Sequence, residues 1–154
     1  MSAAPEALPH RHVLTVPTAS ASVRLARETA EMTYASWGIG TAHPAMGPAL
    51  LILSELVTNS VRHAAVTSPS LTVTFAAGED ALAFAVHDRH PYHPGVVPVA
   101  GHTGGLFTVA EVLAEQGGTL ALRRDADGGG KSVWITLPLR DPLSPLNART
   151  KASP

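Results

Sequence analysis

The sequence predicts an α/β domain, a two-layer sandwich with helices on one face of a mixed, mostly antiparallel sheet. Two observations lead to this prediction. Stretches with the apolar spacing of helices interrupt pairs of short alternating stretches that are typical of strands. The chain has 154 residues, which is enough for one domain with its own hydrophobic core and too few for two domains of usual size. Strand pairs interrupted by helices favour a sheet that is covered on one side.

The N-terminal half predicts a strand followed by two helices. We expect a strand over 12–16, a helix over 20–37 and a helix over 48–65. Pro17 stops the strand, and either Thr18 or Ser20 can cap the first helix. Gly38 and Gly40 end that helix, so two helices precede the next strand.

The C-terminal half predicts two strand pairs separated by a helix. The expected strands are 71–76, 81–86, 119–124 and 132–139, and the helix begins near Leu106 and ends at Gly117 and Gly118. The expected order is therefore β-α-α-β-β-α-β-β. Residues 1–11 and 141–154 have little to bury and are predicted to be disordered tails, so the domain spans 12–140.

The composition narrows the classes of partner. Twelve acidic and eleven basic residues give a formal net charge of -1, which argues against binding to nucleic acid or to an anionic membrane. The chain has no cysteine, which excludes disulfides, thiol nucleophiles and thiolate metal sites. No apolar run has the length of a signal-peptide core or of the ~20 residues that span a bilayer. We therefore expect a cytoplasmic protein with a protein or small-molecule partner.

The stretch from 53 to 64 carries the most chemical information. Glu55, Asn59 and His63 are spaced by four residues and rotate only ~40° from one to the next around a helix, so they share one face. A carboxylate and an amide oxygen one turn apart suit Mg²⁺ or the positioning of a reacting hydroxyl. An amphipathic helix with a solvated polar face is the alternative. The opposite, core-facing stripe is expected to comprise Leu50, Leu53, Val57, Val61 and Ala64.

This stretch resembles the N-box of the GHKL ATPases, and in particular of the anti-sigma-factor serine/threonine kinases, whose helix carries Glu-Leu-Val-Thr-Asn-Ala-x-x-His. The resemblance covers about residues 12–139 and implies a Bergerat-type ATP-binding fold. By this resemblance Asn59 would coordinate the Mg²⁺ that is bound to the ATP phosphates, and Glu55 would act as the general base. Arg62 would approach phosphate, and His63 closes the motif.

Asp88 follows an apolar stretch and should emerge at a strand end beside the buried layer. A carboxylate there can accept a hydrogen bond from the exocyclic amine of adenine, and a simple turn residue is the alternative. The resemblance assigns adenine recognition to Asp88. The family's Asp-x-Gly-x-Gly is here Asp88-Arg89-His90-Pro91-Tyr92, so both glycines are replaced.

A glycine-rich stretch, 101–106, precedes the last predicted helix. Free backbone N–H groups and the helix dipole at such a point suit a phosphate, and an ordinary flexible helix entry is the alternative. The family's Gly-x-Gly-Leu is here Thr103-Gly104-Gly105-Leu106, which keeps only the second glycine. The resemblance assigns these four residues to ATP binding.

The segment 130–134 resembles the family's last box, Gly-Lys-Thr-Val-Trp, and this resemblance assigns Ser132 to the adenine pocket. Lys131 is interpreted as a solubilising charge at a strand edge, and Trp134 as a core residue. Four histidines surround the proposed lid of the site and raise the alternative of zinc binding, although their spacing matches no zinc motif: His87, His90, His93 and His102.

The resemblance implies an ATP- and Mg²⁺-dependent serine/threonine protein kinase that phosphorylates an anti-sigma-factor antagonist and regulates transcription, with a sigma factor as a further partner. A homodimer is one option for its assembly. The alternative is a catalytically inactive module, with or without ATP, that sequesters a partner. The replaced glycines favour the module, whereas the intact Glu55 and Asn59 favour the kinase.

Overall fold

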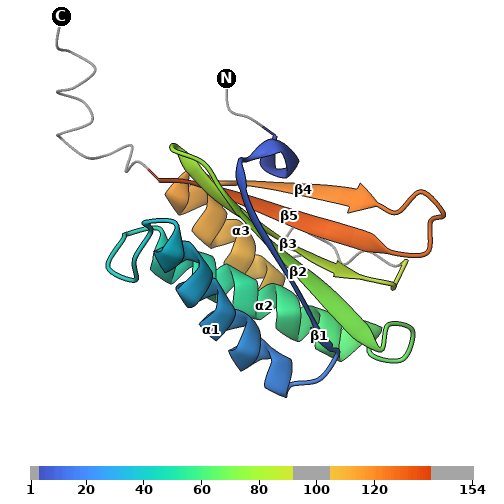
Figure 1. Ribbon diagram of the computed structural model, residues 1–154. Coiled ribbons are helices and arrows are strands. Elements are labelled where there is room, and N and C mark those ends of the chain that lie inside the picture. Colours follow the sequence, from blue (N-terminus) through green and yellow to red (C-terminus); the bar gives the residue numbers. More distant parts are fainter. Residues whose placement is uncertain (1–3, 92–104, 140–154) are drawn as a thin grey trace, which may run out of the picture.

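The computed structural model describes residues 4–91 and 105–139 and confirms the predicted fold class (Figure 1). The elements are a short 3-10 helix η1 (Pro5–Ala7), β1 (His10–Pro17), α1 (Ala21–Ser36), α2 (Met46–Ala64), β2 (Ser70–Ala77), β3 (Ala81–Asp88), α3 (Gly105–Gln116), β4 (Thr119–Arg124) and β5 (Lys131–Pro138). Apart from η1, their order is the predicted β-α-α-β-β-α-β-β. No helix in these described ranges is long and apolar enough to cross a membrane.

The five strands form one sheet in the order β1-β2-β3-β5-β4. Every neighbouring pair is antiparallel, so the sheet is antiparallel throughout instead of mixed. The three helices lie together on one face of the sheet, and α2 contacts both α1 and α3 (Figure 1). Since β5 pairs with β3 on one side and β4 on the other, the end of β3 and the start of β5 are neighbours inside the sheet.

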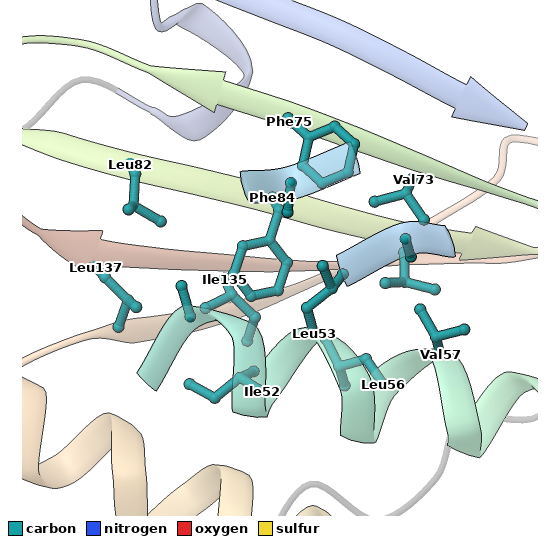
Figure 2. Packing of buried hydrophobic residues seen from close by; sticks show 14 of the residues in the cluster. Ile52, Leu53, Leu56, Val57, Val73, Phe75, Leu82, Phe84, Ile135 and Leu137 are labelled. Atoms are coloured by element: carbon teal, nitrogen blue, oxygen red, sulfur yellow. The ribbon is translucent and has the colours of Figure 1, made fainter. Parts of the chain in front are cut away.

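The main core lies between α2 and the sheet. Figure 2 shows side chains of α2, such as Leu53 and Leu56, facing Phe84 of β3 and Ile135 of β5. All four side chains are buried, and alternate residues of each strand supply the sheet side of this layer. Tyr34 of α1 enters the same core and donates a hydrogen bond to a β3 carbonyl oxygen at 2.6 Å. Burial of this phenol raises its pKa above the usual value.

The buried side of α2 differs from the predicted stripe. Leu53, Val57 and Ala64 are buried as expected, but Leu50 and Val61 are only half-buried. The most protected side chains on the other flank are Ile52 and Leu56. The core side of α2 is therefore rotated toward the row that contains Glu55 and Asn59. The physical reason is that the predicted stripe allows for the sheet alone, whereas α3 also packs against α2.

The prediction that residues 1–11 form a disordered tail is wrong for 4–11, which form η1 and the start of β1. Leu8 packs on the sheet face opposite the helices, against a small apolar cluster made by Ala76, Ala83, Ala85 and Trp134. Glu6 of η1 forms an ion pair with Arg123 of β4 at 3.3 Å. Packing of the partly buried Leu8 therefore fixes a segment whose composition alone does not predict any order. The predicted C-terminal tail, 141–154, lies outside the described residues.

Candidate functional site

The polar row of α2 lies on the side of this helix away from α1. Ser54 accepts a hydrogen bond from Arg27 of α1 at 3.2 Å, which fixes the side that faces α1. Each residue turns the direction by about 100°, so Glu55, Asn59 and His63 point away from that contact. Since α2 lies between α1 and α3 (Figure 1), the row lies on the α3 side.

The burial of this row suits a ligand that is partly enclosed. Glu55 and Asn59 are half-buried, whereas Arg62 and His63 are exposed. Within the described residues, no hydrogen bond or ion pair engages the Glu55 carboxylate or the Asn59 amide. The oxygen atoms of these two groups are therefore available to a hard cation or to a reacting hydroxyl. Mg²⁺ prefers oxygen ligands, and it needs only one or two from the protein when phosphate groups supply further oxygen atoms.

Asp88 is buried at the end of β3, as the sequence predicts, with 3% of its surface exposed. Its Oδ2 accepts a hydrogen bond from the Ser60 hydroxyl of α2 at 2.7 Å. Its Oδ1 accepts one from the Lys131 ammonium at 2.7 Å and one from the His90 backbone N–H at 3.0 Å. Asp88 thus ties together the turn after β3, the helix that carries Asn59 and the start of β5.

Lys131 is not the solubilising edge charge that the sequence suggests. It is 5% exposed and begins β5, an interior strand, directly opposite Asp88 in the register. Its ammonium also donates a hydrogen bond to the His90 carbonyl oxygen at 3.2 Å. The signal for this role lies in strand alternation, since Lys131 shares a face with the core residues Val133 and Ile135.

Ser132 lies on the other face of the sheet, contrary to its assignment to the adenine pocket. It is one residue from Lys131, so its side chain projects from the face that carries Trp134. Trp134 is a buried core residue, as predicted. Position 131, and not 132, therefore faces Asp88. Ser60 is the second residue that sequence reasoning missed, although it directly follows Asn59.

A second set of charges lies on the opposite face of the same strands. His87 Nε2 lies 2.9 Å from an Asp125 carboxylate oxygen, and Arg89 donates hydrogen bonds to Asp125 at 2.6 Å and to Asp127 at 2.9 Å. The hydrogen bond with His87 is the main cause that holds the pKa of Asp125 below its usual value; burial opposes this shift, and the hydrogen bond with Arg89 adds to it. Gly130 closes this turn, where a Cβ would lie 2.7 Å from the Asp88 carbonyl oxygen.

The structure describes only part of the glycine-rich stretch. Gly105 is the first residue of α3 and Leu106 the second, whereas Thr103 and Gly104 lie outside the described residues. Two of the four histidines, His93 and His102, also lie outside them. In the ranges that the structure describes, no three His, Asp or Glu side chains are grouped as they would be around a metal ion.

Comparisons with known proteins bear on this arrangement. Residues 48–141 match the family model described as histidine kinase-, DNA gyrase B-, and HSP90-like ATPase. No curated protein sequence matches the chain. A similar fold occurs in the crystal structure of the RsbU and RsbW domains of Rv1364c from Mycobacterium tuberculosis, with a TM-score of 0.57 and 19% identity over 85% of this chain and 33% of that one.

A further solved structure is the histidine kinase domain from the Erythrobacter litoralis EL346 blue-light activated histidine kinase. It has a TM-score of 0.45 and 18% identity, over 80% of this chain and 62% of that one. The chain therefore spans less than two thirds of either solved structure. The family model covers the α2 helix with Glu55 and Asn59, the Asp88 strand and the Lys131 strand. The chain belongs to the histidine kinase-, DNA gyrase B- and HSP90-like ATPase family, which the GHKL resemblance predicts.

Proposed function

We propose that this chain binds Mg-ATP between α2 and the start of α3 and acts as a regulatory serine/threonine protein kinase of the anti-sigma-factor type. Its phosphoacceptor would be an antagonist protein, and a sigma factor would be a second partner whose release regulates transcription. The observation that carries the proposal is a pair of half-buried side chains, Glu55 and Asn59, one turn apart on the α3 side of α2, whose oxygen atoms have no hydrogen-bond partner among the described residues. Polar side chains on a helix face that only contacts water would be exposed instead of half-buried.

Each of the candidate site residues would have its own role in this reaction. Asn59 would hold Mg²⁺, with Arg62 near the phosphates and Asp88 near the base. Glu55 would accept the proton of a serine or threonine hydroxyl while the hydroxyl oxygen forms a bond to the γ-phosphorus and the bond from that phosphorus to the ADP oxygen breaks. Mg²⁺ supplies charge neutralisation at the phosphates. Phosphoryl transfer needs positioning and charge more than covalent chemistry from the protein, so this small set of groups suffices.

The structure of the RsbU and RsbW domains of Rv1364c contains a similar fold, and the 53–64 helix resembles that of anti-sigma-factor kinases. These two points favour a protein substrate over an autonomous ATPase. A second candidate function, a non-catalytic module that sequesters a partner, has its own support. Asp88 already receives three hydrogen bonds from the protein, and both glycines after it are replaced.

Replacing Glu55 separates the two functions. Glu55→Gln should retain Mg-ATP and partner binding and lose phosphoryl transfer, because the amide cannot accept the hydroxyl proton. Radiolabel transfer to candidate antagonist proteins and calorimetry with Mg-ATP give the two readouts. Glu115→Gln, on the exposed side of α3, is the matched control and should transfer phosphate at the rate of the unmodified protein.

Equal transfer by Glu55→Gln and the unmodified protein would reject Glu55 as the base. Binding of Mg-ATP without transfer to any antagonist would favour the sequestering module. Asn59→Ala tests the ligand site itself, because this variant should stay folded and lose Mg-dependent ATP binding. Unchanged affinity in folded Asn59→Ala would reject the Mg²⁺ assignment.

A further inference from the structure

The Asp88 carboxylate is already largely satisfied by the protein itself. An ionised carboxylate offers about four lone-pair positions. The Ser60 hydroxyl takes one on Oδ2, and the His90 N–H and the Lys131 ammonium take two on Oδ1. An incoming base therefore finds one free position, on Oδ2, or has to displace a donor that is already bound.

Lys131 is the unusual donor of the three, because it also neutralises the charge of the carboxylate. Its side chain is 6% exposed and that of Asp88 3%, so both charges are shielded from water. Two of the three ammonium protons have acceptors inside the protein, Asp88 Oδ1 and the His90 carbonyl oxygen. This geometry ties Lys131 to the turn after β3 and argues against a role as a phosphate ligand.

We infer that Lys131 is an internal competitor of the nucleotide base: it holds Asp88 in a buried ion pair and thereby limits the affinity of this site for adenine nucleotides. This inference rests on the proposed nucleotide site. The base's exocyclic amine either shares a carboxylate whose charge is neutralised or displaces the ammonium, which then loses its buried counter-ion. In the free protein the same pair satisfies a carboxylate that would otherwise be buried and unpaired.

Lys131→Met tests this inference, because methionine has a similar length and no donor. We expect Mg-ATP to bind about tenfold tighter than to the unmodified protein, as a charged hydrogen bond no longer competes for Asp88. Calorimetry measures this affinity. The preference for ATP over GTP should also widen. Structural damage, in contrast, would lower the affinities for both nucleotides together. Arg123→Gln is the control, since it removes one positive charge from β4 at an exposed position and should leave both readouts unchanged.

Thermal unfolding monitored by circular dichroism shows whether the variant is folded. If Lys131→Met is not folded, Lys131→Gln decides the question, because it keeps a neutral donor and should give a smaller gain of the same sign. Equal or weaker Mg-ATP binding by a folded variant, while the unmodified protein binds, would overturn the inference and leave the nucleotide site standing. Absence of Mg-ATP binding in every variant would overturn both.

Discussion

Two ion-pair regions occupy opposite faces of the sheet at the same strand ends. On the helix face, Asp88 pairs with Lys131, and both are buried. On the other face, His87 and Arg89 pair with Asp125 and Asp127 at distances as short, yet these side chains are between 23% and 65% exposed. The chain neighbours His87 and Asp88 thus belong to different regions because a strand alternates its side chains.

The difference shows that distance alone does not give the strength of an ion pair. In water the attraction between two charges is screened, and exposed pairs contribute little. A buried pair interacts strongly, but its charges are costly to remove from water, and losing one partner leaves the other uncompensated. The exposed region joins the β4–β5 turn to β3, whereas the buried region lies where a ligand would have to compete with it.

The largest effect is expected from Asp88→Ala. This change leaves the Lys131 ammonium buried without its counter-ion and removes the acceptor for Ser60, so the free energy of unfolding should fall by about 3–5 kcal/mol. Urea unfolding measures the loss. A loss under about 1 kcal/mol would mean that the buried ion pair contributes no more to the free energy of unfolding than the exposed ones.

Base selectivity should depend on the buried region alone. A carboxylate acceptor suits the adenine amine and meets a carbonyl oxygen in guanine, an encounter that costs on the order of tenfold to a hundredfold in affinity. We therefore expect ATP to outcompete GTP, and Asp88→Asn to narrow the gap. Asp125→Asn is the matched change on the other face and should leave the ratio of the two affinities unaltered. Equal binding of ATP and GTP by the unmodified protein would contradict the adenine assignment.

A smaller effect is expected from Asp125→Ala, the counterpart of Asp88→Ala. It removes the partner of His87 and one of the two partners of Arg89, but water can solvate these side chains, so the unfolding free energy should fall by less than about 1 kcal/mol. Repeating the urea titration at high ionic strength should shrink the difference further. A loss as large as that of Asp88→Ala would show that the exposed network is more strongly coupled than its burial indicates.

The smallest effect concerns pH. The pKa of Asp125 is lowered in the folded protein, mainly by the hydrogen bond with His87, so its ionised form stabilises the fold. That contribution is present above the unfolded-state pKa of about 4 and is lost as the pH falls through the lowered folded-state pKa. The stability gap between the unmodified protein and Asp125→Asn should therefore shrink below about pH 4. A gap that is constant across this acidic range would contradict the assignment.

Local features of the sequence determined most of the fold. Helical periodicity placed Glu55 and Asn59 on one face, because their relative direction depends only on the geometry of one helix. Gly38 and Gly117 adopt positive φ angles of 87° and 68° where α1 and α3 end, as their sequence positions predict. Asp88 ends β3 because the apolar run before it ends there.

The tertiary structure decided which strands are neighbours. The start of β5 lies beside the end of β3 only because β5 is inserted between β3 and β4, and no local pattern contains that order. This pairing makes Lys131 the partner of Asp88 and turns Ser132 to the other face. Likewise, the packing of α3 against α2 turns the buried side of α2 away from the stripe that periodicity predicts. A sequence specifies the direction of each side chain within its own element, whereas its partner depends on long-range packing between elements.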